Sequence, residues 1–241
     1  MNYASYENNN HVLIKGKIKE LPTYSHTVMG EGFFEMLIEV QRLSDEVDEL
    51  PITISERLIK DFKIGDEIGL SGQFRSYNKI EENKSKLMLT IFVKELLDPN
   101  EMNEVNQIFL IGYICKEPIY RTTPFGREIC DCLLAVNRAY NKSDYLPCIA
   151  WGRNARFVKD LVVGEKLEVQ GRIQSRKYQK KINENAFETK TAYEISLSSV
   201  MIALDENYSD TNNITNSQCL NSMAQNDGIQ GKKLENSSEA I

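Results

Sequence analysis

The sequence predicts an all-β protein built from two tandem copies of one five-stranded barrel. Three observations carry this prediction: short apolar segments, turn signals between them, and a repeat of both along the chain. The chain has 241 residues, which is enough for two domains with a proper core in each.

The first copy contains five predicted strands and one predicted helix. Ser55 is a suitable helix cap, and Leu58, Ile59 and Phe62 provide an apolar side for the segment that follows it. A turn at 63–66 then leads into the fourth strand. Five strands with one helix between the third and the fourth is the order of an OB-fold barrel. The strands are predicted at 11–19, 33–40, 50–54, 67–75 and 86–93, with the helix at 55–61.

A second copy follows a proline-containing polar linker at 98–105. The same order of segments then begins again. Its strands are predicted at 107–114, 128–136, 145–151, 166–174 and 191–204, with the helix at 154–161.

The two copies align with nearly constant spacing. Gly16 falls on Gly112 at an offset of 96 residues, and Gly72 falls on Gly171 at an offset of 99. The second copy therefore has three more residues around its helix. We predict one OB-fold at 10–97 and another at 106–204.

Residues 205–241 are rich in Asn, Ser, Thr, Asp and Glu and nearly free of aromatic residues. Such a segment buries too little apolar surface to offset its ordering entropy. The sequence therefore predicts a disordered polar and acidic tail.

Composition is that of a globular protein, with 41% hydrophobic and 27% charged residues. The apolar runs are far shorter than a membrane span, and residues 1–10 carry no signal-peptide pattern, so we expect a cytoplasmic protein without membrane contact. The five cysteines lack C-x-x-C spacing, which argues against a zinc site. Cys130 and Cys132 fit an apolar strand as small buried residues, and no cofactor is predicted.

Charge is distributed unevenly, although the whole chain has a net charge of −6. Basic and acidic residues number 12 and 17 in 1–100, 15 and 12 in 101–204, and 2 and 6 in 205–241. Only the middle segment is basic. Because phosphate responds to the local field, this segment is the candidate for nucleic-acid binding.

Aromatic and basic residues alternate along two predicted strands of this middle segment. Tyr145 and Trp151 share one strand face, and Arg172, Arg176 and Tyr178 share a face of another if that strand is regular. Such a surface can stack unpaired bases while its cations follow the phosphates. A core position for Trp151, surface tyrosines and an ordinary solvated arginine face remain alternatives, and 177–189 alternatively forms a plain exposed hairpin.

Three blocks in the second copy extend this interpretation: LAVNR at 134–138, CIAWGRNA at 148–155 and VQGRIQSRKY at 169–178. With them, residues 107–204 resemble the bacterial single-stranded DNA-binding protein family. The resemblance implies sequence-independent binding of single-stranded DNA in replication, recombination and repair, without catalysis. It also implies a homo-oligomer, here a dimer with four OB-folds. The residues that it implies for binding are Tyr140, Tyr145, Trp151 and Tyr178, with Arg138, Arg153, Arg172, Arg176 and Lys177 nearby.

The first copy departs from that pattern at all four stacking positions. Ser44, Glu49, Ser55 and Lys79 stand there, and Asp45, Glu46 and Asp48 add negative charge. We therefore expect the first barrel to have lost or weakened DNA binding and mainly to support pairing between barrels. The resemblance also implies recruitment of replication or repair proteins by the tail, although this terminus lacks the family's acidic Pro-Phe tip.

Two other functions stay open from the residues. A primosome-type or scaffold protein would use its OB-folds to contact proteins, and an RNA-binding OB protein would use the same stacking and backbone contacts. An enzyme is the least supported class, because we find no phosphate-cradling glycine motif, no metal-ligand spacing and no nucleophile with a nearby His.

Overall fold

A computed structural model describes residues 9–81, 84–183 and 186–203 of the chain. The described part is an all-β protein, as the sequence predicts. Its eleven strands follow the sheet order β2-β3-β5-β4-β1-β6-β10-β11-β9-β8-β7, with additional pairings between β1 and β2 and between β6 and β8.

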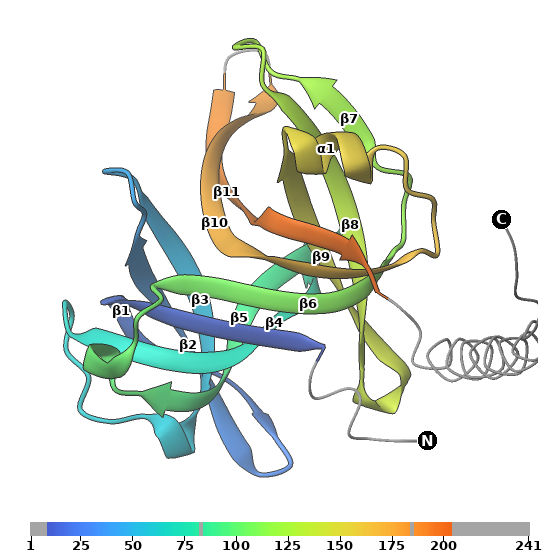
Figure 1. The fold of residues 1–241 in the computed structure, drawn as a ribbon. Helices are drawn as coiled ribbons and strands as arrows, with labels where there is room; N and C mark the ends of the chain where they lie inside the picture. Colours follow the sequence, from blue (N-terminus) through green and yellow to red (C-terminus); the bar gives the residue numbers. More distant parts are fainter. Residues whose placement is uncertain (1–8, 82–83, 184–185, 204–241) are drawn as a thin grey trace, which may run out of the picture. The chain divides into compact units, whose positions relative to one another are not determined.

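The first five strands, which we call the N-terminal set, close into a barrel (Figure 1). β1 pairs with both β2 and β4, β2 pairs with β3, and β5 completes the ring between β3 and β4. The β3–β5 pairing is parallel, and the others are antiparallel. A closed five-stranded barrel is thereby confirmed. The strands are β1 (Asn10–Val28), β2 (Glu31–Gln41), β3 (Val47–Ser55), β4 (Glu67–Glu81) and β5 (Lys84–Leu97).

The strands that follow, which we call the C-terminal set, repeat this pairing order. β6 pairs with β8 and β10, β8 pairs with β9, and β11 lies between β9 and β10. The β9–β11 pairing is again parallel. The set comprises β6 (Asn106–Ile114), β7 (Ile119–Thr122), β8 (Glu128–Arg138), β9 (Lys142–Trp151), β10 (Lys166–Asn183) and β11 (Ala186–Ile202).

The short β7 strand is absent from the sequence-based prediction. It pairs only with the edge of β8, and all four of its residues are exposed. With no buried face, it shows no alternation of apolar and polar residues, so period-two analysis does not detect it.

The helices also differ from the prediction. The helix predicted at 55–61 is a single 3-10 turn, η2 (Glu56–Leu58), after which Ile59 returns to extended backbone. Its apolar residues still pack against the core, which explains the misleading pattern. In the C-terminal set, α1 spans Arg153–Val158, and two further 3-10 turns are η3 (Pro99–Glu101) and η4 (Ala139–Asn141).

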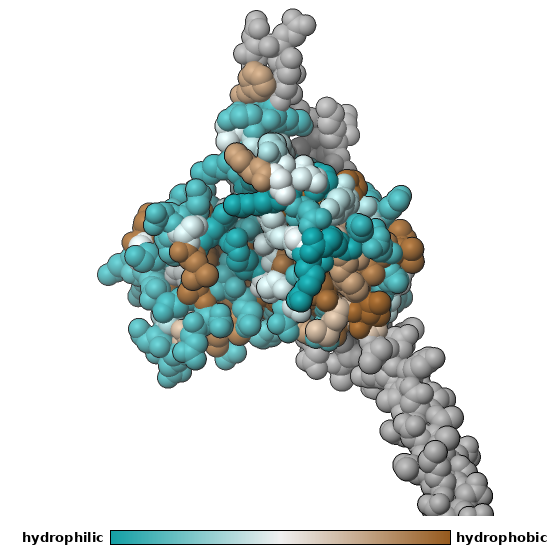
Figure 2. Space-filling model, turned by 45° about the horizontal axis from the view of Figure 1, so that its top comes forward, coloured by the Kyte–Doolittle hydropathy of each residue, from teal (hydrophilic) through white to brown (hydrophobic). Residues whose placement is uncertain are grey.

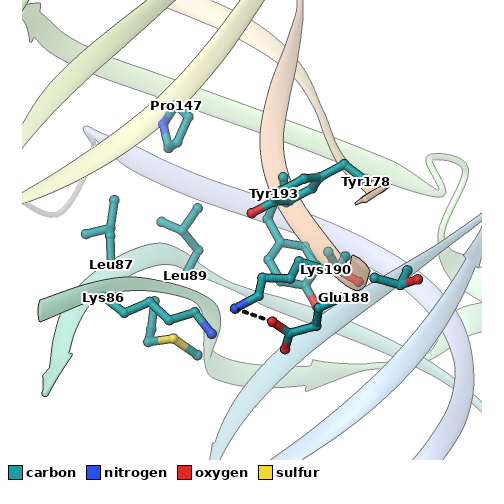
Figure 3. Close-up of a pocket in the computed structure, with 12 residues that line it drawn as sticks. Lys86, Leu87, Leu89, Pro147, Tyr178, Glu188, Lys190 and Tyr193 are labelled. Atoms are coloured by element: carbon teal, nitrogen blue, oxygen red, sulfur yellow. Dashed lines mark ion pairs between the residues drawn. The ribbon is translucent and has the colours of Figure 1, made fainter. Parts of the chain in front are cut away.

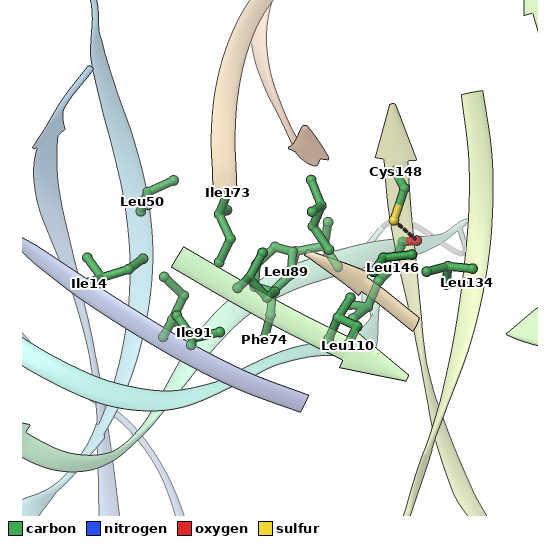
Figure 4. Close-up of a cluster of buried hydrophobic side chains, with 14 of the residues drawn as sticks. Ile14, Leu50, Phe74, Leu89, Ile91, Leu110, Leu134, Leu146, Cys148 and Ile173 are labelled. Atoms are coloured by element: carbon green, nitrogen blue, oxygen red, sulfur yellow. Dashed lines mark hydrogen bonds between the residues drawn. The ribbon is translucent and has the colours of Figure 1, made fainter. Parts of the chain in front are cut away.

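The buried side chains form one continuous apolar cluster across both sets (Figure 4). Alternation along the strands produces it: Leu146, Cys148 and Ala150 on β9 are at most 3% exposed. Phe74 is the largest fully buried side chain. Cys130 and Cys132 are buried as free thiols, in agreement with their predicted place in the core.

The two sets join through antiparallel pairing of β1 with β6, which lie side by side in Figure 1. At the centre of this pairing Val12 faces Ile108, its own counterpart at the 96-residue offset. The contact is thus an internal version of a two-fold symmetric interface.

Matching hydrogen bonds support this symmetry on both sides. Asn10 Nδ2 donates to the Phe74 carbonyl over 2.7 Å, and Oδ1 of Asn10 accepts from the Phe74 amide over 2.9 Å. Asn106 makes the same two bonds to Ile173, at the same two distances.

Glycines at equivalent positions of the two copies adopt the same backbone geometry. Gly65 and Gly164 adopt positive φ values of 90° and 99°, in the region that side chains with a Cβ avoid. Gly72 and Gly171 lie at β-bulges, where a Cβ would collide with the carbonyl oxygens of Phe92 and Ser196. The spacing seen in the sequence therefore reflects repeated backbone geometry.

One face of the molecule is mostly hydrophilic, with hydrophobic residues in separate patches (Figure 2). Within the described ranges, no helix has the length and apolar character needed to cross a membrane. The predicted tail at 205–241 lies outside the described residues.

Candidate nucleic-acid interface

A groove of about 800 Å³ is lined by residues of both sets, mostly of the C-terminal set, and we call it the basic groove. β9 contributes Trp151 and β10 contributes Arg172, Arg176 and Lys177. Four of the nine residues predicted for binding thus lie in one cavity. Arg121, Arg127 and Arg42 add three further cations.

Trp151 is the last residue of β9, and 37% of its surface is exposed. Its strand neighbours at even positions are buried, so its ring lies on the opposite side of the strand. Ile129, its cross-strand partner, and Ile149 form apolar walls of the same groove. The ring is therefore partly exposed to the groove, and the alternative of a fully buried core residue does not apply.

The cations of β10 are held by nearby carboxylates. Arg172 lies 3.6 Å from Asp48, Arg176 lies 3.8 Å from Glu194, and Lys177 lies 3.2 Å from Glu49. Their side chains remain 40%, 58% and 63% exposed. The carboxylates are less exposed, at 0%, 13% and 25%, so a phosphate would reach each cation from its solvent side.

Two of these carboxylates come from the N-terminal set. The sequence suggests that Asp48 and Glu49 place negative charge across that set's own binding face. In the structure Asp48 is fully buried and accepts a 2.6 Å hydrogen bond from the Ser175 amide on β10. Arg42 donates to both oxygens of Asp48, over 2.8 and 2.6 Å. Asp48 therefore belongs to the contact between the two sets.

Glu49 lies between two lysines at the edge of the groove. Lys19 donates to Oε1 of Glu49 over 2.8 Å, and Lys177 donates to the same atom over 3.2 Å. The hydrogen bond from Lys19 is the main reason that the pKa of Glu49 is lowered, and partial burial opposes the shift. Glu49 consequently stays ionised and holds Lys177 near the groove.

Tyr178 occupies a different cavity, of about 530 Å³, which we call the tyrosine pocket (Figure 3). Leu87 and Leu89 of β5 line it together with Pro147 and Tyr193. Glu188 and Lys190 form a 3.0 Å ion pair at its edge. Tyr178 is 38% exposed, but β5 of the N-terminal set lies beside it, so it does not share the groove of Trp151.

The remaining predicted residues lie apart from the basic groove. Tyr140 is 87% exposed in the η4 turn, where it adopts a φ of 62°. Tyr145 is 46% exposed on β9, and Arg153 is exposed at the start of α1. Arg138 donates to Asp144 over 3.1 Å.

Sequence reasoning misses Arg121 and Arg127 because they lie on or after the unpredicted β7. Arg121 Nε donates to Asp131 over 2.7 Å, which fixes its position at the rim. Their signal in the sequence is two arginines on either side of a Thr-Thr-Pro turn, which is indistinguishable from a solvated loop.

The described residues offer little for catalysis or metal binding. They contain no group of three His, Cys, Asp or Glu side chains placed to hold a metal ion. Burial raises the pKa of the Cys130 thiol to about 11, so this cysteine is a poor nucleophile.

Comparison with known proteins matches the segment that contains most of this groove. The model of the single-strand binding protein family matches residues 105–203, which include Trp151 and the whole of β10. This segment is similar to the single-strand binding protein family. The chain is 35% identical over 92 residues to single-stranded DNA-binding protein 1 of Staphylococcus aureus (strain COL), a match that covers 35% of this chain and 55% of that protein.

Other relatives give the same result. Single-stranded DNA-binding protein A of Bacillus subtilis (strain 168) is 32% identical over 97 residues, covering 37% of this chain and 56% of that protein. The chain spans about half the length of the curated relatives it matches.

A solved structure extends the likeness to the fold of both strand sets. The wild-type single-stranded DNA binding protein from Thermus aquaticus has a TM-score of 0.61 at 18% identity, covering 81% of this chain and 93% of that one. At this identity the likeness concerns the fold.

Proposed function

We propose that the chain binds single-stranded DNA without sequence preference, through the basic groove of its family segment. The observation that carries the proposal is the partly exposed ring of Trp151, which lines one groove with Arg172, Arg176 and Lys177. A base stacks on the indole ring, at about 1–3 kcal/mol per base, and the cations contact the phosphates.

The ion pairs of the groove explain how binding responds to salt. Each cation of β10 has a carboxylate partner in the free protein and an exposed side that a phosphate can contact. Counterions leave the strand at the same time, so affinity falls as salt rises. The carboxylates keep the empty groove from attracting other anions tightly.

We further propose that the two sets are tandem OB-fold barrels. The first spans 10–97, a linker at 98–105 follows, and the second spans 106–204, before a disordered tail at 205–241. The same ring of strand pairings in both sets supports this division.

Assembly and cellular role complete the proposal. Two barrels per chain make a dimer sufficient for four, and the acidic tail is a candidate site for replication or repair proteins. The protein acts without catalysis, in the cytoplasm. These parts rest on the family resemblance and on the repeat.

Equilibrium binding of a labelled oligo-dT to the full chain tests the central proposal. We expect Trp151→Ala to weaken binding about 5- to 150-fold, which corresponds to the loss of one stacked base. Phe157→Ala on α1 is a matched control, because Phe157 is 39% exposed and lies away from the groove, and it should bind as the wild type does.

Two outcomes would contradict the proposal. Equal affinities of the Trp151→Ala variant and the wild type would remove the groove from the binding site. Preferential competition by oligo-U over oligo-dT would shift the function to RNA.

A further inference from the structure

The N-terminal set has a cavity of its own, of about 590 Å³, which we call the phenylalanine pocket. Phe33 of β2 and Phe92 of β5 line it with Arg75 of β4. Arg138 and Lys142, from the C-terminal set, complete its rim. The four family stacking positions of the first copy are not among its lining residues, so the loss of those aromatics leaves this site intact.

The phenylalanine pocket is the symmetry counterpart of the basic groove. Phe33 and Thr53 fall on Ile129 and Ile149 at the 96-residue offset. Arg42 and Arg138 are also related by this offset. Arg42 of the N-terminal set lines the basic groove, and Arg138 of the C-terminal set lines the phenylalanine pocket. The 99-residue offset relates further lining residues on β4 and β10: Arg75 to Gln174, Ser76 to Ser175, and Tyr77 to Arg176. One architecture therefore builds both cavities.

The two cavities differ in their acidic residues. Lys142 stands in the phenylalanine pocket where the basic groove has Glu46. Thr90 lies at the place on β5 that Glu194 occupies on β11, because Thr90 pairs with Arg75 and Glu194 pairs with Gln174. One carboxylate, Glu35, remains in the pocket and accepts a 2.8 Å hydrogen bond from Ser25. Two carboxylates of the basic groove, Glu46 and Glu194, thus have no acidic counterpart in the phenylalanine pocket.

Arg75 is positioned by neutral neighbours and can accept an anion as its partner. Its guanidinium lies 3.8 Å from the centre of the Phe92 ring and donates to Gln73 over 2.8 Å. Within the described part of the chain it forms no ion pair with a carboxylate. Burial, with a smaller effect of nearby Arg138, lowers the pKa of Arg75 to about 10. A phosphate would restore a favourable field at this group.

Aromatic rings continue from Arg75 to the surface. Phe92 and Phe33 have ring centres 5.5 Å apart, and Phe33 stacks on His26 at 5.4 Å with an interplanar angle of 18°. His26 is exposed. An exposed ring at the end of a stack, beside Arg75 and the exposed Lys142, is the combination that single-stranded nucleic acid requires.

We propose that the phenylalanine pocket binds a second segment of the same DNA strand, with bases against the His26–Phe33–Phe92 stack and phosphates on Arg75 and Lys142. This inference rests on the proposed function of the basic groove. It replaces the expectation that the first copy only supports pairing between barrels. The chain then offers two related DNA contacts instead of one.

Binding of an oligo-dT length series to the full chain at several salt concentrations tests this inference. We expect Arg75→Gln with Lys142→Gln to leave the affinity for the shortest oligomers unchanged and to abolish the gain at greater length. The salt slope should fall in magnitude by about 1.4, at about 0.7 per lost phosphate contact on a single strand. The matched double variant Lys63→Gln with Lys94→Gln removes two exposed cations outside the pocket and should keep the wild-type slope.

A second readout needs no substitution. Oligo-dT containing 5-iodouracil, photocrosslinked to the wild-type chain, should label peptides that contain His26, Phe33 or Phe92 as well as the Trp151 peptide. Labelling confined to the Trp151 peptide, with an unchanged salt slope in the Arg75 and Lys142 variant, would overturn this inference and leave the proposed function standing. Failure of the wild-type chain to bind oligo-dT would overturn both.

Discussion

Asp48 shows how one buried carboxylate joins the two strand sets. It accepts hydrogen bonds from the guanidinium of Arg42 and from the amide and hydroxyl of Ser175. Its counterpart Asp144 accepts from the Ser76 amide over 2.7 Å and from Arg138, but Oδ2 of Asp144 has no partner in the described structure. The two aspartates therefore occupy equivalent positions in the interface but differ in their hydrogen bonding. Both oxygens of Asp48 have partners, whereas only one oxygen of Asp144 has any.

Substitution of Asp48 tests this residue-scale account. Asp48→Ala leaves the partly buried Arg42 and the Ser175 amide without their partner, so we expect a loss of about 3–5 kcal/mol in the free energy of unfolding. Chemical denaturation of the full chain measures it. Asp45→Ala removes an exposed carboxylate from the same turn and should change stability by no more than about 0.5 kcal/mol. A loss at Asp48 as small as that at Asp45 would contradict the account.

At the residue scale, the sequence predicts part of the site. Period-two alternation places Trp151 and Arg172 on exposed strand faces, and both line the basic groove. Alternation does not tell which strands meet when a barrel closes, so the separation of Tyr178 into the tyrosine pocket is not predictable from it. Nor does it reveal that Asp48 reaches across to β10, because that contact joins residues 127 positions apart.

At the scale of elements, the positions shared by the two copies are mainly those where the backbone geometry requires a particular residue. Gly72 of β4 and Gly171 of β10 lie opposite the same bulge, whose extra residue is Lys94 on β5 and Ser198 on β11, and each glycine lies close to a carbonyl of that neighbouring strand. Bulges bend a strand and increase its twist, which a small closed barrel requires. The repeat survives at such positions while the exposed side chains have diverged.

Gly171→Ala tests this role. A Cβ at this position meets the Ser196 carbonyl oxygen, which belongs to the backbone of β11 and cannot yield without a shift of that strand. We expect destabilisation of about 1–3 kcal/mol, measured by thermal or chemical unfolding. Gln170→Ala, at the exposed neighbouring position, should be nearly neutral. A neutral Gly171→Ala variant would show that the bulge tolerates a side chain.

The sequence predicts most strands but not every segment between them. Apolar alternation identifies the ten strands of the two rings, because one face of each is buried. It fails at 55–61, where Leu58, Ile59 and Phe62 imitate a helix face while packing as a loop. It also fails at β7, which has no buried face.

At the scale of the whole molecule, the distribution of charge matters more than its total. The chain has a net charge of −6, yet the basic groove gathers six of its arginines and lysines from three segments distant in sequence. Three of these cations pair with carboxylates and still have 40% to 63% of their side chains exposed. An acidic protein can therefore present a local surface for DNA.

The internal two-fold relation also determines where DNA contacts can lie. Pairing of β1 with β6 relates the basic groove to the phenylalanine pocket, so that each cavity takes residues from both sets. One chain thus forms by itself the pair of cavities that a symmetric dimer of single barrels would form.

Intrinsic fluorescence tests the central claim most directly, because Trp151 is the only tryptophan in the chain. Titration of the unmodified protein with oligo-dT should quench Trp151 emission to saturation, and added salt should reverse the quenching, because a base stacks on this ring while phosphates hold the strand. Unchanged emission during binding that fluorescence anisotropy of a labelled strand detects would show that the DNA lies elsewhere, and would contradict the assignment of the basic groove.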